Sequence, residues 1–132
     1  MIDASASSSQ KTILVVEDNQ ALRAAFQDIL QAAGYRVISA SDGREALDLF
    51  HGQNTKVNLL ISDIHMPEMN GFTLAERLRQ TDPEIKVLMM SGQRPEEADD
   101  VPASIPIDGW LQKPIGLRDF TRSVNELLRG PA

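Results

Sequence analysis

Three carboxylates, a hydroxyl and an ammonium group follow directly after short apolar runs of the sequence: Glu17 and Asp18, Asp63, Ser91 and Lys113. Carboxylates that lie close together repel one another wherever water is partly excluded. A cluster of three persists if one is protonated or if a cation lies among them. Because oxygen ligands without histidine or cysteine favour a hard ion, these residue types indicate Mg²⁺ rather than zinc.

The same residue types suit the transfer of a phosphoryl group, because Mg²⁺ readily shares its ligand shell with phosphate oxygens. Asp63 lies between a strand-like run and a proline-containing loop, and a carboxylate is a known nucleophile toward phosphorus. Glu17 and Asp18 are better placed as metal ligands. Lys113 can pair with a carboxylate or a phosphoryl oxygen, and the Ser91 hydroxyl can donate to another. The set supplies the alignment and charge neutralisation that phosphoryl transfer needs.

Short apolar runs alternate with stretches of helical periodicity along the chain. The expected strands are residues 12–16, 35–40, 57–61, 85–90 and 107–111, and the expected helices are 20–33, a short one from 43, 72–80 and 117–128. Alternating strands and helices predict an α/β fold, a parallel sheet with right-handed crossovers and helices on both faces. Ligands of such sheets bind outside the carboxyl ends of the strands, so the five side chains should meet at one edge.

The region between the fourth and fifth strands breaks this pattern. Residues 94–106 contain three prolines and the acidic run EEADD, which predicts a short or irregular fourth helix. At the chain ends, residues 1–10 are small and polar, as in a flexible leader or linker, and residues 130–132 form a stub. The domain is therefore expected to span residues 11–129.

The composition of the chain limits which cellular compartment and which kinds of partner are expected. The chain has 132 residues, a net charge of −6 and no cysteine, which excludes a disulfide scaffold and a catalytic thiol and disfavours direct binding to nucleic acid. No apolar run is long enough to cross a membrane, and the polar start is unlike a signal peptide. We expect a cytoplasmic domain without membrane contacts.

Four motifs together resemble the receiver domain of bacterial two-component response regulators, the CheY-like family: VVEDN at 15–19, DIHMPEMNG at 63–71, MMSG at 89–92 and WLQKP at 110–114. The resemblance covers about residues 11–129. It implies a flavodoxin-like (βα)5 fold, a doubly wound five-stranded parallel sheet in the order 2-1-3-4-5. It also implies a role in two-component phosphorelay signalling.

The resemblance implies how the acidic residues act. Asp63 would accept a phosphoryl group from a phosphohistidine. Asp18 and Asp63 would bind Mg²⁺ directly, with the backbone carbonyl of His65 as a third protein ligand, and Glu17 would act mainly through a bound water. Mn²⁺ could substitute for Mg²⁺.

The resemblance also implies roles for the residues that respond to phosphorylation. Ser91 and Lys113 would hold the phosphoryl oxygens, and the Lys113–Pro114 peptide bond would be cis. Ser91 would move toward the phosphoryl group while the aromatic side chain of Trp110 turns inward. The outcome would be a change in affinity for partners.

The partners implied are a sensor histidine kinase or a histidine phosphotransfer protein, docked around the first helix and the loop after Lys113; the downstream partner stays unknown. WLQKP also resembles receivers attached to hybrid sensor kinases, so the chain could be part of a kinase. Beyond self-phosphorylation and slow autodephosphorylation, no enzymatic activity is expected.

Three other functions remain possible from the residues. An aspartyl-phosphate phosphatase usually carries a second aspartate where this chain has His65. A flavodoxin-like cofactor binder would need a phosphate loop, but the EDN segment after the first strand is anionic. A docking module that works without phosphorylation would not need its acidic residues.

Overall fold

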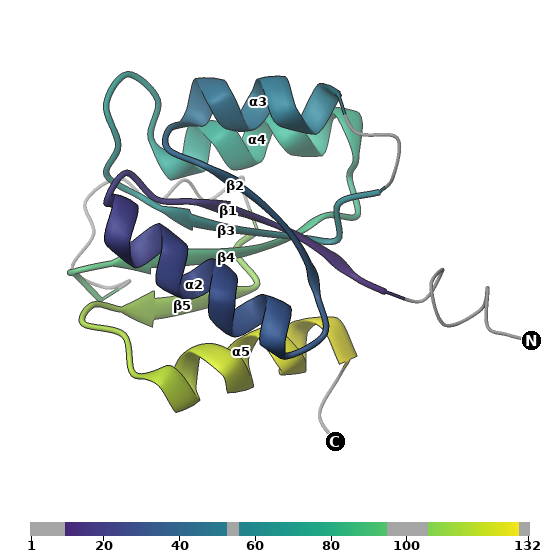
Figure 1. The fold of residues 1–132 in the computed structure, drawn as a ribbon. Helices are drawn as coiled ribbons and strands as arrows, with labels where there is room; N and C mark the ends of the chain where they lie inside the picture. The colour runs from purple at the N-terminus through teal and green to yellow at the C-terminus, as the bar shows by residue number, and fades with distance from the viewer. Residues whose placement is uncertain (1–9, 53–55, 95–105, 130–132) are drawn as a thin grey trace, which may run out of the picture.

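A computed structural model of the protein describes residues 10–52, 56–94 and 106–129. Its strands are β1 (Thr12–Val16), β2 (Arg36–Ala40), β3 (Leu59–Asp63), β4 (Lys86–Ser91) and β5 (Gly109–Gln112). Its helices are α2 (Gln20–Ala32), α3 (Gly43–His51), α4 (Gly71–Thr81) and α5 (Leu117–Arg129). The labels follow Figure 1.

The strands form one parallel sheet in the order β2-β1-β3-β4-β5. The α/β class, the flavodoxin-like sheet and its strand order are therefore confirmed. Helices α3 and α4 cover one face of the sheet, and α2 and α5 cover the other (Figure 1). Alternation along β1 shows why both faces are covered: Leu14 and Val16 lie in the core under α3 and α4, whereas Ile13 and Val15 lie in the core under α2 and α5.

Most element boundaries lie within one residue of the expected ones, but β3 and β5 begin two residues later. Leu59 is the first residue of β3 to pair with β1, opposite Ile13, and Asp63 still pairs with Met90 of β4. Sheet pairing uses backbone groups, so the polar residues Ser62 and Asp63 extend the strand although the apolar run ends before them.

Polar side chains fix where the helices begin. Asn19 accepts a hydrogen bond from the backbone N–H of Leu22, and Asn70 accepts one from that of Thr73. Gly34, which follows α2, has φ 97°, a conformation that glycine adopts without strain. The cap of α2, Asn19, thus lies directly after Glu17 and Asp18, and the cap of α4, Asn70, lies seven residues after Asp63.

Some expectations lie outside the described residues. The irregular helix expected within 94–106 falls almost wholly on residues 95–105, and the leader and the stub fall on 1–9 and 130–132, so these predictions stay untested. In the part of the chain that the structure describes, no helix is long and apolar enough to cross a membrane. The cytoplasmic location stays a prediction.

Candidate functional site

The three acidic residues meet at one edge of the sheet. Val16 pairs with Ser62, so one residue further along these neighbouring parallel strands Glu17 lies beside Asp63. Asp18 comes next, before the cap of α2. One carboxylate oxygen from each of the three residues lies within 4.8 Å of the others. Glu17 and Asp63 are buried, at 1% and 7% exposure, whereas Asp18 is exposed.

Lys113 reaches into this acidic cluster from the end of β5. Its ammonium nitrogen lies 3.0 Å from Oε1 of Glu17 and 3.0 Å from Oδ2 of Asp63. Its backbone N–H donates to the carbonyl of Ser91 at 2.7 Å, and the Lys113–Pro114 peptide bond is cis. Three strand ends, of β1, β3 and β5, thus contribute charged groups that touch one another.

Comparison with known proteins identifies the family. Residues 13–125 match the family model described as "Response regulator receiver domain". The chain belongs to the response regulator receiver family.

Individual relatives agree with this assignment. The chain is 38% identical over 122 residues to the sensor kinase CckA of Brucella abortus, covering 92% of this chain and 13% of that kinase. The chemotaxis response regulator CheY4 of Vibrio cholerae superposes with a TM-score of 0.79 at 29% identity, over 89% of this chain and 98% of that one. The response regulator TrrA of Thermotoga maritima, solved with Mg²⁺ and BeF, superposes with a TM-score of 0.76 at 29% identity. The match covers 89% of this chain and 99% of that one.

The family match confirms the predicted role in two-component signalling. Sensor kinases and transcriptional regulators are both among the relatives, and the chain spans between 12% and 51% of their length. The family membership therefore holds for the receiver domain and leaves the whole protein's activity open.

Burial and neighbouring groups shift the pKa values of Glu17 and Lys113 in the receiver's site. Removal from water raises the pKa of Glu17, against the Asn19 backbone N–H and the Lys113 ammonium, which lower it. Burial lowers the pKa of Lys113, but its hydrogen bonds to Glu17 and Asp63 and their charges outweigh this and raise it. The lysine therefore stays charged at neutral pH.

The acidic cluster fits a divalent cation. Lys113 brings one positive charge to a cluster of three carboxyl groups, and the three side-chain atoms that lie close together are all carboxylate oxygens. This donor set suits a hard ion such as Mg²⁺. His65 follows in the loop between β3 and α4 with an exposed side chain.

Ser91 is the last residue of β4, and Trp110 lies on the neighbouring strand β5. Ser91 is buried at 1% exposure, and its hydroxyl accepts a hydrogen bond from the backbone N–H of Gln93 at 3.0 Å. The indole N–H of Trp110 donates to the carbonyl of Gln93 at 2.9 Å. The ring of Trp110 lies 6.5 Å from that of Phe72.

Two contacts near the site were not predicted from the sequence. The guanidinium of Arg23, on α2, donates to the backbone carbonyl of Glu17 at 2.7 Å. The carbonyl of Gln93 accepts the Trp110 bond described above. Arg23 lies one turn after the N-cap Asn19, and that position could have suggested a contact with the residues before the helix. The sequence holds no signal for the bond from Trp110 to the Gln93 carbonyl, because that carbonyl belongs to a loop.

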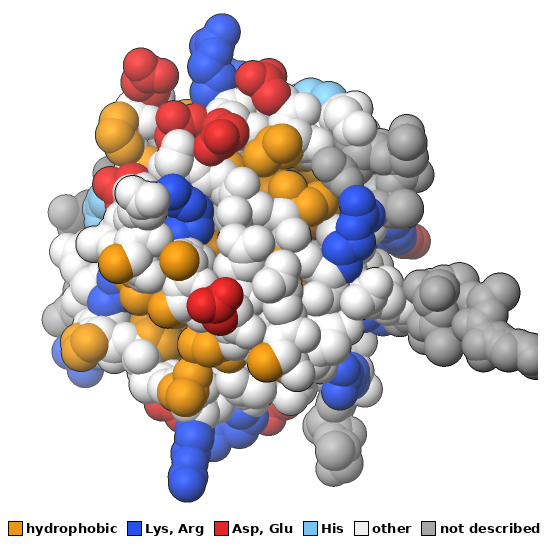
Figure 2. Space-filling model, in the orientation of Figure 1, with side chains coloured by type: hydrophobic (Ala, Val, Ile, Leu, Met, Phe, Trp, Pro, Cys, Tyr) orange, Lys and Arg blue, Asp and Glu red, His pale blue; other side chains and the backbone are white. Residues whose placement is uncertain are grey.

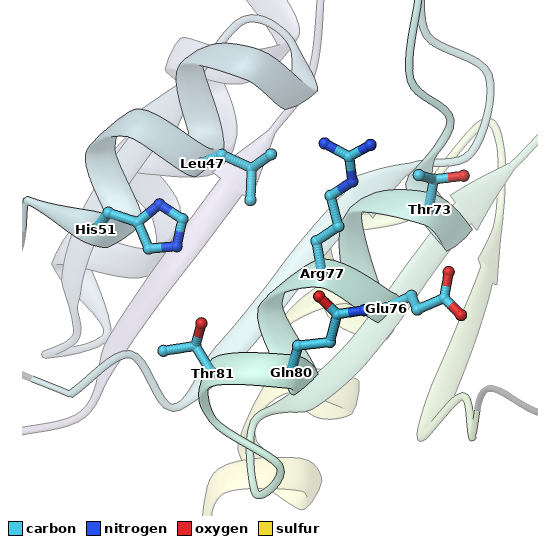
Figure 3. Close-up of a pocket in the computed structure, with 7 residues that line it drawn as sticks. All are labelled: Leu47, His51, Thr73, Glu76, Arg77, Gln80 and Thr81. Carbon is cyan, nitrogen blue, oxygen red and sulfur yellow. The ribbon is translucent and has the colours of Figure 1, made fainter.

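A separate pocket of about 530 Å³ lies between α3 and α4 (Figure 3). Its lining side chains are Leu47, His51, Thr73, Glu76, Arg77, Gln80 and Thr81. None of the predicted site residues lines it, and its charges are mixed. The pocket is therefore not the site at which the acidic cluster and Lys113 meet.

Proposed function

We propose that this receiver domain accepts a phosphoryl group from a phosphohistidine onto the carboxylate of Asp63, in a reaction that requires Mg²⁺. The observation that carries the proposal is the meeting of Glu17, Asp18 and Asp63 within 4.8 Å, with Lys113 in contact with two of them. Of the three carboxylates, Asp63 lies on the central strand β3, accepts a hydrogen bond from Lys113, and pairs with Met90, the residue before Ser91 on β4.

In the proposed reaction a carboxylate oxygen of Asp63 attacks the phosphorus of the donor. A new O–P bond forms, the N–P bond of the phosphohistidine breaks, and the imidazole leaves with the electron pair of that bond. The ammonium of Lys113 neutralises negative charge on the carboxylate and on the incoming phosphoryl oxygens. The Ser91 hydroxyl has one proton and can donate to a phosphoryl oxygen.

We assign the metal to Asp18 and Asp63 as direct ligands, with the backbone carbonyl of His65 and with Glu17 acting through water. Bound there, Mg²⁺ would reduce repulsion between the acidic cluster and the phosphoryl group. This assignment rests on the donor set and on the solved relative that holds Mg²⁺ and BeF.

The phosphoryl donor would be a sensor kinase or a histidine phosphotransfer protein that docks beside the site. We place the docking surface on the start of α2 and the segment that leads into α5. Leu117 is the only large hydrophobic side chain that is exposed among the described residues, at 60%. It lies one turn before Phe120, whose ring stacks on Phe26 of α2. Hydrophobic side chains are visible on the face formed by α2 and α5 (Figure 2).

The similarity to sensor kinase CckA supports a second possibility for the whole protein, that this domain works within a hybrid kinase. The receiver chemistry is the same in either case. The chain itself would phosphorylate on Asp63 and slowly lose the group by hydrolysis, without turning over an external substrate.

Intact-mass spectrometry tests the proposal. The purified chain is incubated with acetyl phosphate, with Mg²⁺ or with EDTA. We expect one added phosphoryl group with Mg²⁺, little with EDTA, and none in Asp63→Asn. Asp48→Asn, an exposed carboxylate on α3, serves as the matched control and should be phosphorylated like the wild type. An adduct that persists in Asp63→Asn would refute Asp63 as the acceptor.

A further inference from the structure

Four polar atoms of Glu17, the first residue after β1, make hydrogen bonds. Its backbone N–H donates to the carbonyl of Ala40 at 3.1 Å. Its two carboxylate oxygens accept from the ammonium of Lys113 at 3.0 Å and from the backbone N–H of Asn19 at 3.1 Å. Its carbonyl accepts from the guanidinium of Arg23 at 2.7 Å, the shortest of these bonds. The turn between β1 and α2 is therefore held firmly at its first residue.

Asp18 lies between two of the groups that are held in this way. The peptide before it carries the Glu17 carbonyl, which Arg23 holds, and the peptide after it carries the Asn19 N–H, which the Glu17 side chain holds. Because each peptide unit is planar, fixing both of them fixes the direction in which the Asp18 side chain leaves the backbone. Asp18 is exposed, and its carboxylate has no hydrogen-bond partner among the residues that the structure describes. Its direction therefore depends on the backbone.

Arg23 is well suited to hold this turn. Its backbone N–H donates to the carbonyl of Asn19 at 2.9 Å, and the Asn19 side chain caps α2, so the base of the arginine side chain is fixed in the helix. The guanidinium is planar and rigid, and a bond from a charged donor is stronger than one from a neutral donor. The start of α2 thus holds the turn that precedes it through a single side chain.

The charge of Arg23 should act on a metal ion in the opposite direction to its hydrogen bond. A positive charge close to the site repels a cation, so its removal alone would tighten Mg²⁺ binding. Loss of the hydrogen bond would loosen the turn and weaken Mg²⁺ binding. Among the described residues, Arg23 bonds to a backbone carbonyl and makes no ion pair with the acidic cluster, which favours the hydrogen bond as the main contribution.

We propose that Arg23 is a positioning residue for Mg²⁺: by holding the Glu17 carbonyl, it sets Asp18 in advance in the direction from which that carboxylate would bind the ion. This inference rests on the proposed function, in which Asp18 is a direct metal ligand. A ligand that is already oriented loses less conformational entropy when the ion binds.

Calorimetric titration of the whole chain with Mg²⁺ tests this role. Arg23→Met keeps the apolar stem and removes the donor and the charge. Its dissociation constant for Mg²⁺ should rise between about threefold and tenfold, the loss expected for one hydrogen bond. Arg77→Met is the matched control, because it removes the same charge from an exposed position on α4, beside the separate pocket (Figure 3), and should bind Mg²⁺ like the wild type. An unchanged or lower dissociation constant in Arg23→Met would overturn the inference.

Hydrogen exchange measured by NMR without metal separates positioning from a general effect on the fold. In Arg23→Met the backbone N–H of Asn19 should exchange faster than in the wild type, because the turn opens more often. The N–H of Leu60, in the centre of β3, should keep its wild-type rate. Equal exchange of Asn19 in both proteins, or a matching increase at Leu60, would contradict a local positioning role.

Phosphorylation by acetyl phosphate, a donor that needs no docking on α2, gives a third measurement. Arg23→Met should be slower at limiting Mg²⁺ and should reach the wild-type rate at saturating Mg²⁺; a rate that stays low at saturation would overturn the inference. If the wild type binds no Mg²⁺, the proposed function fails and this inference with it. If the wild type binds Mg²⁺ and Arg23→Met binds it equally well, only this inference is rejected.

Discussion

Lys113 is the residue on which the charge balance of the site depends. Its ammonium contacts Glu17 and Asp63, both of which are buried, and it is itself only partly exposed. Removing one member of a buried charged group leaves the others without compensation. The lysine therefore stabilises the folded state in addition to its proposed role toward the phosphoryl group.

Lys113→Gln should lower the free energy of unfolding at neutral pH by about 1–2 kcal/mol, less than for a fully buried pair because water screens the partly exposed ammonium. Urea unfolding at pH 7 measures this. The pKa of Glu17 is raised, so its ionisation costs stability as the pH rises through that value. The loss caused by Lys113→Gln should accordingly shrink as the pH falls through the pKa of Glu17, because the neutral carboxyl no longer needs a counter-charge.

A matched control is Lys56→Gln, which breaks the ion pair with Glu84 at a surface position. This change should leave the unfolding midpoint unaltered. An equal loss in both variants would show that the contacts of Lys113 contribute no more than an ordinary surface pair.

Single residues differ in how far the sequence could predict them. Glu17, Asp63 and Lys113 lie at or just beyond the ends of parallel strands, and strand order alone brings such residues to one edge. The bond from Trp110 to Gln93 depends on a side-chain rotamer and on the path of a loop. The spacing of residues along the sequence determines neither of them, so the bond could be identified only from the structure.

At the scale of the elements, α4 approaches β3 so closely that only glycine fits between them. The N–H of Gly71 donates to the carbonyl of Ile64 at 2.9 Å. A Cβ atom at position 71 would lie 2.7 Å from the carbonyl oxygen of Asp63 and 3.1 Å from the sulfur of Met89. The start of α4 is thus packed directly against the backbone of the proposed phosphoacceptor.

Gly71→Ala should destabilise the protein by about 1–3 kcal/mol, because the backbone at Asp63 or the helix has to move. It should also slow phosphorylation by acetyl phosphate. Chemical denaturation and the mass assay measure the two effects.

Gly92→Ala provides the control, since a Cβ there meets no atom within 4 Å. Its stability should change by less than about 0.5 kcal/mol. A Gly71→Ala protein as stable as the wild type would show that the start of α4 can move away from the Asp63 carbonyl without a loss of stability.

Most of the helices and strands could be predicted from the sequence, because apolar residues recur at helical spacing in the helices and form continuous runs in the strands. The late start of β3 was not, since Val57 is apolar and buried like the strand residues but precedes the pairing with β1. Here the hydrophobic pattern reports burial, whereas the strand boundary depends on backbone pairing.

At the scale of the whole molecule, the site and the proposed docking surface are adjacent. Lys113 contacts the acidic cluster, and four residues later Leu117 is exposed at the start of α5. Motifs spread along the chain predicted the family and its chemistry. The identity of the donor could not be predicted, because recognition depends on surface shape and on a second protein.

Leu117→Ser should slow phosphotransfer from a phosphorylated histidine phosphotransfer protein about tenfold, while phosphorylation by acetyl phosphate stays at the wild-type rate. Losing a large apolar contact from an interface centre costs on the order of 1–2 kcal/mol. Rapid-quench measurements with both donors test this. The control is Ala32→Ser, at the far end of α2, which should leave both rates unchanged. If Leu117→Ser is phosphorylated by both donors as fast as Ala32→Ser, the proposed docking surface is contradicted.

The central claim is that Asp63 becomes an acyl phosphate, and chemical trapping tests it most directly. Borohydride reduces an acyl phosphate of aspartate to homoserine, which peptide mass spectrometry locates in the sequence. After treatment with acetyl phosphate and Mg²⁺, we predict homoserine at position 63 and at no other aspartate. Homoserine at position 18 with Asp63 intact, or no reduced residue in a chain that carries a phosphoryl group, would contradict the account.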